Sequence, residues 1–203
     1  MIALEGLRVL SALLLLSLVM FFFRLYVPAS LCALLFVFSL YFFRDPSRKG
    51  EYKSDEIISP ADGKILEISR DSGYVSISIF MSITDVHVNR VPYGGVVRSV
   101  KRSGKKFLKA FLKEADFENV QCETVIESPG LGVYRVIQIS GIIARRIVNN
   151  LKVGDKVETG QRMGIILYGS KVKLILPEER VELLVNVNEK VKAGVTTIAR
   201  LRR

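Results

Sequence analysis

Gly164-Ile165-Ile166-Leu167-Tyr168-Gly169-Ser170-Lys171-Val172 consists of two apolar runs separated by a glycine–serine pair. Apolar runs rich in β-branched residues predict strands, and Gly-Ser is ordinary turn chemistry between them. The same dipeptide can also be a bond that a chain cuts for itself, because glycine leaves its carbonyl uncrowded and serine supplies an adjacent hydroxyl nucleophile. The stretch therefore predicts β structure, and it predicts self-cleavage only if the rest of the chain supports it.

The chain beyond Arg44 continues with short strand-like runs separated by turn residues. We expect strands at residues 57–58, 64–69, 74–80, 95–100, 124–127, 133–140, 164–168, 172–176 and 181–187. Apolar residues at helical spacing predict a helix over residues 105–115, and residues 142–150 are expected to form a second short helix. The pattern predicts a mainly β (α+β) domain.

Two further segments suggest which β fold this is. Residues 59–65, Ser-Pro-Ala-Asp-Gly-Lys-Ile, and residues 153–161, Val-Gly-Asp-Lys-Val-Glu-Thr-Gly-Gln, resemble the two halves of a lipoyl-type barrel-sandwich hybrid. In that fold the second motif is a turn between two strands, so Gly154 and Gly160 are interpreted as structural. We therefore expect a compact lipoyl-type β sandwich with one or two short helices.

An almost entirely apolar run covers residues 7–43. A helix crosses the hydrocarbon core with about 20 apolar residues, so this run is too long for a single pass. Arg24 and Pro28 lie where a turn would fall, which predicts a transmembrane helical hairpin within residues 1–43 and a separate domain over residues 44–203. A cleaved signal peptide is the alternative, but no small-residue cleavage site follows a short apolar core.

The basic residues indicate on which side of the membrane the second domain lies and what kind of molecule it binds. Arg44, Arg48, Lys49 and Lys53 follow the apolar run, and the positive-inside rule places them, with the second domain, on the cytoplasmic side of the cell membrane. The formal net charge of +10 favours an anionic partner. No nucleic-acid-binding motif is recognisable, so anionic lipid head groups are the better match. Residues 101–106 form the densest basic cluster, for which a solvated loop is the alternative interpretation.

The few cysteines and the single histidine limit which disulfides and metal sites this chain could form. Cys32 lies in the apolar run and Cys122 in the second domain, so an intramolecular disulfide is not expected. His87 is the only histidine, and with two separated cysteines it cannot assemble an ordinary zinc site. We therefore expect no metal.

Four motifs occur in a defined order along the chain. They are Ile-Ser-Pro-Ala-Asp-Gly-Lys at residues 58–64, Ser-Ile-Thr-Asp-Val-His-Val-Asn-Arg-Val-Pro at 82–92, Gly-Ile-Ile-Ala-Arg-Arg-Ile at 141–147 and Tyr-Gly-Ser-Lys at 168–171. From about Phe43 to Leu176 the chain resembles the phosphatidylserine decarboxylase proenzymes in their short (A-type) form. The resemblance implies a carboxy-lyase that converts phosphatidylserine, or its ether-linked archaeal counterpart archaetidylserine, to the ethanolamine phospholipid and CO2.

The resemblance also implies how the enzyme matures. Ser170 attacks the carbonyl of Gly169, an N-to-O acyl shift gives an ester, and elimination leaves residue 170 as an N-terminal pyruvoyl group. That group replaces pyridoxal phosphate, because it forms a Schiff base with the substrate amine and accepts electrons as CO2 leaves. The mature protein would be a heterodimer of residues 1–169 and 170–203, and the family suggests a further dimer.

Two residues are the candidates for acid–base work. Asp62 matches the family's Ser-Pro-x-Asp-Gly motif, in which the carboxylate assists self-cleavage by orienting or charging the base; capping of the turn is the alternative. His87 is the natural proton carrier, because its side chain titrates near neutral pH. The longer bacterial form of the family has His-x-x-His here, and Arg90 stands at the second histidine's position.

The remaining candidates concern substrate binding. Asn89 and Arg90 are expected to position the substrate carboxylate or phosphate, with packing as the alternative. Arg145 and Arg146 are adjacent, so on a helix only one would point easily into the site, as a phosphate ligand. Residues 118–122 depart from the family's usual Asn-Glu-Arg, and no substrate contact is carried over to them.

Other functions fit the sequence less well. Membrane transporter adaptors also join an apolar N-terminal segment to a lipoyl-type domain, but they usually have long coiled-coil arms, and no sustained heptad is visible here. A lipoyl or biotinyl carrier is disfavoured because no hairpin tip presents an acceptor lysine. The residues do not distinguish phosphatidylserine from archaetidylserine, nor do they set the oligomeric state.

Overall fold

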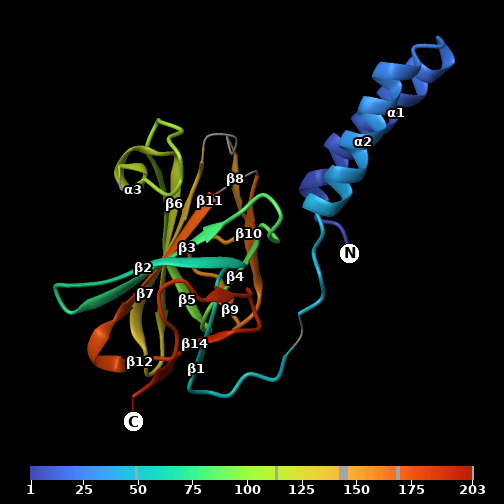
Figure 1. Cartoon of the computed structure of the whole chain (residues 1–203). Helices are drawn as coiled ribbons and strands as arrows, with labels where there is room; N and C mark the ends of the chain where they lie inside the picture. The colour runs from blue at the N-terminus through green and yellow to red at the C-terminus, as the bar shows by residue number, and fades with distance from the viewer. Residues whose placement is uncertain (49, 113, 142–145, 168–169, 203) are drawn as a thin grey trace. The chain divides into compact units, whose positions relative to one another are not determined.

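The computed structural model describes residues 1–48, 50–112, 114–141, 146–167 and 170–202. The chain forms two compact units, Met1–Ser47 and Arg48–Arg203. The first is helical and the second is mainly β (Figure 1).

The helical unit contains a short 3-10 turn, η1 (Leu4–Gly6), followed by α1 (Leu7–Phe22) and α2 (Tyr26–Phe42). The hydroxyl of Ser17 donates to the carbonyl of Ala29 at 3.0 Å, so the two helices pack against each other. Ala3 N–H donates to the carbonyl of Phe43 at 2.8 Å, which brings the outer ends of the pair together. The helical stretch Leu4–Phe22 is long and apolar enough to cross a membrane, with a mean hydropathy of 2.0, whereas α2 is shorter.

The described residues of the β unit form three sheets, and all the strand pairs among them are antiparallel. The eight-stranded sheet runs in the order β13 (Lys190–Val191), β2 (Gly63–Asp71), β3 (Tyr74–Met81), β11 (Ser170–Pro177), β7 (Gly132–Ile139), β6 (Gln121–Ser128), β5 (Gly95–Ser103) and β9 (Lys156–Val157). A second sheet has the order β4 (Val88–Arg90), β10 (Arg162–Ile166), β8 (Ile147–Asn149), and a third has the order β1 (Glu56–Ile58), β14 (Thr197–Leu201), β12 (Val181–Leu183). The helix α3 (Ala115–Glu118) and the 3-10 turn η2 (Glu178–Arg180) complete the unit.

Strand alternation decides which side chains enter the core. In β11, Val172, Leu174 and Leu176 are fully buried in the main hydrophobic cluster. Ser170 has the same parity as these residues, so its side chain faces inward, whereas Lys171 faces the other side of the sheet. The residue at the proposed cleavage point is therefore part of the core face.

The prediction of a mainly β unit is confirmed, and each predicted strand coincides with an observed one. The last one is too long as predicted: residues 181–187 contain a strand only at Val181–Leu183. The two apolar runs that flank the Gly-Ser pair become β10 and β11, which belong to different sheets.

The predicted helix at residues 105–115 is wrong. The structure places a helix only at Ala115–Glu118, and the described residues before it are irregular. The backbone here bonds to distant groups instead of to itself. Both the N–H and the carbonyl of Leu108 are bound by the side chain of Asn119, and the N–H groups of Lys105 and Lys106 donate to the carbonyl of Glu118. Helical spacing of apolar residues was thus overridden by tertiary hydrogen bonds.

The second predicted helix, at residues 142–150, is also wrong where it can be compared. Ile147–Asn149 is strand β8, paired with β10, while residues 142–145 lie outside the described part of the chain. Short apolar runs do not distinguish buried strand from helix, and here the available edge of β10 decided the outcome.

Candidate active site

Ser170 is the first residue of β11 and is fully buried. It pairs with Met81, the last residue of β3, in the middle of the eight-stranded sheet. The Ser170 hydroxyl donates to the Met81 sulfur at 3.4 Å. A serine hydroxyl in this position is shielded from bulk water and held in one orientation; Gly169, its predicted partner in cleavage, lies outside the described residues.

A chain of three side-chain amides leads to the same sulfur, and two of them, Asn89 and Gln138, are fully buried. The side-chain nitrogen of Asn89 in β4 lies 3.7 Å from Met81 Sδ, and its oxygen accepts a hydrogen bond from Gln138 Nε2 in β7 at 2.8 Å. Asn149 Nδ2 in β8 donates to Gln138 Oε1 at 3.2 Å. Each link fixes the next amide's orientation, so the Asn89 N–H₂ group is held toward the residue that contacts Ser170.

Sequence reasoning named Asn89 but missed Gln138 and Asn149. Both are polar residues next to apolar ones in short strands, at Val136-Ile137-Gln138-Ile139 and Ile147-Val148-Asn149. An inward-facing amide in such a strand requires a partner, because an unpaired buried polar group is costly. That signal was available in the sequence, but the pairing of β7 with β6 and β11, and of β8 with β10, was not.

His87 is fully buried immediately before β4. Its Nδ1 lies 2.9 Å from the carbonyl oxygen of Asp85. A carbonyl can only accept, so Nδ1 carries the proton, and Nε2 is the basic nitrogen of the neutral ring. The His87 carbonyl accepts from the N–H of Ile166 at the end of β10, which brings the histidine to the segment that leads into Ser170.

Asp62 is buried at the start of β2, where Gly63 passes so close to the carbonyl of Phe80 that a Cβ would overlap it. Both carboxylate oxygens of Asp62 are held by the guanidinium of Arg48, with Nη2–Oδ2 at 2.7 Å. The N–H of Ala193 also donates to Oδ1, at 2.8 Å. These bonds tie the turn of residues 59–63 to the C-terminal segment, and the action of Asp62 on His87 stays a prediction.

The predicted arginines occupy different environments. The Arg90 guanidinium donates to the carbonyl of Gly160 at 3.1 Å, a contact that supports packing of β4 against the β9–β10 turn. Arg146 is exposed, and its carbonyl accepts from the N–H of Leu167, so it lies beside the segment that precedes Ser170. Arg145 lies outside the described residues.

Lys171 is a site neighbour that sequence reasoning missed. Its ammonium group forms an ion pair with Asp116 in α3, and the two side chains are only 4% and 12% exposed. Lys173 Nζ lies 3.5 Å from the other oxygen of Asp116. The residue next to Ser170 is therefore tied to α3 on the face of the sheet opposite to Ser170.

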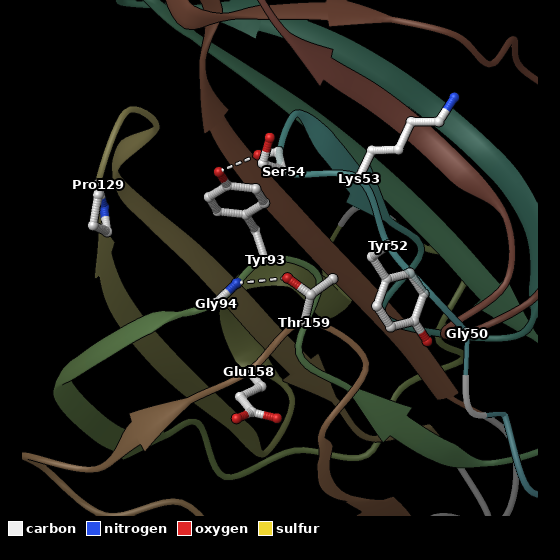
Figure 2. Close-up of a pocket in the computed structure, with 9 residues that line it drawn as sticks. All are labelled: Gly50, Tyr52, Lys53, Ser54, Tyr93, Gly94, Pro129, Glu158 and Thr159. Carbon is white, nitrogen blue, oxygen red and sulfur yellow. Dashed lines mark hydrogen bonds between the residues drawn. The ribbon is translucent and has the colours of Figure 1, made fainter.

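A separate hollow lies on another part of the β unit, lined by Tyr52, Tyr93, Thr159 and their neighbours (Figure 2). Its polar groups bond to one another: Tyr93 donates to the carbonyl of Ser54 at 2.6 Å, and Gly94 N–H donates to the Thr159 hydroxyl at 2.9 Å. Burial, with the nearby carboxylate of Asp55, raises the pKa of Tyr93, so that phenol stays a donor. None of the predicted site residues that the structure describes lines this hollow.

Metal ligands do not gather in the described part of the chain: no group of three or more His, Cys, Asp or Glu side chains there could hold an ion. Both cysteines are free. Burial raises the pKa of the Cys122 thiol, while Arg102 and a hydrogen bond from Asn149 oppose that shift. Cys122 is therefore a packed residue and not a thiolate nucleophile.

Comparison with known proteins gives a consistent result. The sequence model described as phosphatidylserine decarboxylase matches residues 35–199. A phosphatidylserine decarboxylase proenzyme from Carboxydothermus hydrogenoformans is 44% identical, over 83% of this chain and 82% of its own length. One from Prosthecochloris aestuarii is 38% identical over 99% and 98%. A protein from Methanosarcina barkeri with the provisional name archaetidylserine decarboxylase proenzyme is 41% identical over 82% and 78%.

Proposed function

Because the chain belongs to the phosphatidylserine decarboxylase family and is a decarboxylase, we propose that it removes CO2 from the head group of phosphatidylserine or archaetidylserine and releases the ethanolamine phospholipid. The names of its relatives include both lipids. The two substrates share the serine head group, so the same side chains serve either one.

The observation that supports this proposal is the buried Ser170 hydroxyl at the start of β11. In self-cleavage its oxygen forms a bond to the carbonyl carbon of Gly169, and its proton passes to a base. The C–N bond then breaks and the proton is delivered to the serine nitrogen, which leaves an ester. A base then removes the α-proton of residue 170, the Cβ–O bond breaks, and residue 169 leaves as a C-terminal carboxylate. The dehydroalanine that remains tautomerises to an imine, which one water hydrolyses to ammonia and the carbonyl of residue 170. A site closed to bulk water keeps the ester from simple hydrolysis.

His87 is the proposed base, since its Nδ1–H bond to the Asp85 carbonyl makes Nε2 the basic nitrogen of the neutral ring. Asp62 is proposed to assist the same step, through the turn that Arg48 holds in place. One of Arg145 and Arg146 is proposed to bind the lipid phosphate at the segment leading to residue 170, and Asn89 and Arg90 are proposed to position the substrate carboxylate or phosphate.

The surroundings of Ser170 fit a pyruvoyl group. A keto group needs little more space than the serine hydroxyl, and the thioether of Met81 beside it is not a nucleophile that would attack a carbonyl. The Asn89 N–H₂ group, held by Gln138 near the same sulfur, is a donor suited to a carbonyl oxygen. The pyruvoyl carbonyl supplies the electron sink for decarboxylation, and no pyridoxal phosphate is required. His87 is proposed to return a proton to the substrate carbon after CO2 leaves.

The wider architecture is proposed to match this chemistry. Residues 1–43 would be a transmembrane hairpin, and residues 44–203 the catalytic domain, with a lipoyl-type sandwich on the cytoplasmic side. The exposed apolar side chains along α1 and α2 support a lipid environment. After cleavage, residues 1–169 and 170–203 would stay together as a heterodimer, because β11 pairs with β3 and β7 along most of its length. A dimer of such heterodimers would follow the family.

The test is intact-mass analysis of purified protein with an assay of CO2 release from both lipids. We expect two chains, ending and beginning at residues 169 and 170, with a blocked N-terminus on the second. Ser170→Ala should abolish both cleavage and decarboxylation. Ser78→Ala, which changes another buried serine in the adjacent strand, is the matched control and should leave both intact. A single uncleaved chain in fully active protein would contradict the proposal.

A further inference from the structure

The segment that connects β5 to β6, residues 104–120, exposes large apolar side chains. We call it the β5–β6 excursion. Phe117 is 81% exposed, Phe111 54% and Leu112 38%. Single exposed apolar residues are common on protein surfaces, but two phenylalanines and a leucine within seven positions of one connection form a cluster. Such a cluster requires an apolar partner.

The charges around this cluster indicate what the partner is. Residues 101–120 contain six lysines and arginines against three acids. Lys106 holds Glu118 at 2.8 Å, and Asp116 is held by Lys171, so two of the acids are already neutralised. Lys109 Nζ lies 5.8 Å from the centre of the Phe111 ring. Exposed aromatic rings interspersed with lysines are the composition of segments that lie in the interface of an anionic bilayer.

The excursion is held firmly to the sheet. Asn119 is fully buried and bonds both backbone groups of Leu108, and it also donates to the carbonyl of Ser140 at 2.7 Å. The Phe111 ring meets Phe80 of β3 edge-on, with centroids 6.3 Å apart. Apolar side chains on a fixed support enter an interface without a large cost in ordering the backbone.

The excursion also lies next to the reactive residue. Asp116 pairs with Lys171, and Phe80 is the strand partner of Lys171 in β3. Both contacts are made one residue away from Ser170, on the opposite face of the same strand. A lipid bilayer that receives the excursion would therefore present head groups at the end of β11 where residue 170 begins.

We propose that the β5–β6 excursion inserts Phe111, Leu112 and Phe117 into the surface of an anionic bilayer and so brings lipid head groups to residue 170. This inference rests on the proposed function for its substrate, but insertion is measurable without any turnover. It assigns to the excursion a membrane contact separate from the apolar helices α1 and α2. Phe117, the most exposed of the three, should reach deepest.

The chain contains no tryptophan, so one introduced indole reports on one place. The full-length Phe117→Trp protein is reconstituted into phosphatidylglycerol vesicles with and without brominated acyl chains. We expect bromolipid to remove most of its fluorescence and the emission to be blue-shifted relative to detergent. Val153→Trp is the matched control, because Val153 is 66% exposed in the connection between β8 and β9, and its fluorescence should hardly change. Equal quenching at both positions, or none at position 117, overturns the proposal.

Two further fluorescence results would contradict the proposed insertion into an anionic bilayer. If emission of Phe117→Trp is blue-shifted in detergent alone and depends on protein concentration, a second copy of the chain covers the cluster and the proposal is wrong. If quenching is as strong in neutral phosphatidylcholine vesicles, the assignment to anionic lipid is wrong.

A second experiment measures whether membrane insertion of the excursion is needed for lipid turnover. The Phe111→Ser/Phe117→Ser protein should contain the wild-type amount of two-chain product and turn over a water-soluble short-chain serine phospholipid normally, while its turnover of long-chain lipid in vesicles falls at least several-fold. Val153→Ser should behave as wild type in all three measurements. If the double variant also loses short-chain turnover, the excursion acts on the site itself and the membrane role is refuted. If wild-type protein turns over neither lipid, the proposed function fails, and the quenching result still stands.

Discussion

Lys171, next to the reactive residue Ser170, forms a buried ion pair with Asp116. We predict that replacing Asp116 lowers the stability of the fold more than replacing Lys171 does. Lys171 and Asp116 are 4% and 12% exposed, and Lys173, which is 23% exposed, lies 3.5 Å from the second oxygen of Asp116. Replacing Asp116 with leucine leaves the Lys171 ammonium buried without its carboxylate. Replacing Lys171 with methionine leaves Asp116 with Lys173 as a remaining cation.

The structure sets the size of each effect. Loss of one partner from a buried pair costs about 3–5 kcal/mol when the other charge is stranded, which is the case for Asp116→Leu. Lys171→Met removes a charged hydrogen bond but strands no charge, so we expect a loss of about 1.5–3 kcal/mol. The double variant places two apolar side chains together and should lose less than Asp116→Leu alone, because apolar replacement of a whole buried pair is often close to neutral.

The measurement is thermal unfolding of the full-length chain in detergent, followed by far-UV circular dichroism. All variants are made in the Ser170→Ala background so that each sample is one uncleaved chain. One kcal/mol corresponds to about 2–4 °C in a domain of this size, so Asp116→Leu should lower Tm by roughly 6–20 °C. The control is Glu127→Gln, which breaks an ion pair with Arg98 whose side chains are 49% and 58% exposed. That change should cost at most about 1 kcal/mol.

Two results would refute this reasoning. One is that Lys171→Met lowers the stability as much as Asp116→Leu does. Lys173 would then not stabilise the Asp116 carboxylate after Lys171 is removed, and the predicted difference between the two variants would be wrong. If the double variant loses as much as the sum of the single variants, the two charges are not coupled and the excursion is not clamped to β11 by this pair.

The remaining predictions concern the proton carriers and the thiol. His87→Ala should lose decarboxylation even in molecules that have matured on long incubation, measured as CO2 released per carbonyl trapped with a hydrazine; wild-type turnover per carbonyl would exclude His87 as proton carrier. General acid–base help is worth about 10²–10⁴ in rate, so Asp62→Ala should slow maturation from minutes toward days, read from the two-chain fraction on gels. Burial raises the pKa of Cys122, so in a Cys32→Ala background iodoacetamide should label it only when denaturant opens the fold; fast labelling of native protein would contradict that burial.

The residues proposed for the site could be named from the sequence because they lie in local motifs, and their roles stay predictions. The Gly-Ser pair, the turn around Asp62 and the motif around His87 are contiguous stretches whose residue types already limit their chemistry. The structure then places Ser170 on the core face and turns the Nδ1 of His87 toward Asp85, details that depend on strand parity and on a short loop. The partners that hold these residues could not be read in the same way. Arg48 was interpreted only as a charge beside the membrane, and it proved to bind Asp62.

The sequence by itself determined the apolar N-terminal segment and the mainly β character of the rest, because hydropathy and strand alternation are properties of neighbouring residues. Only the tertiary structure decided what residues 105–115 and 147–149 would become, since Asn119 and the edge of β10 offered the backbone better partners than its own helix. The same holds for the chain of Asn89, Gln138 and Asn149, which joins three strands that belong to two different sheets. A buried polar group must find a partner, but which partner it finds is set by how the strands pair and pack, and no local pattern encodes that.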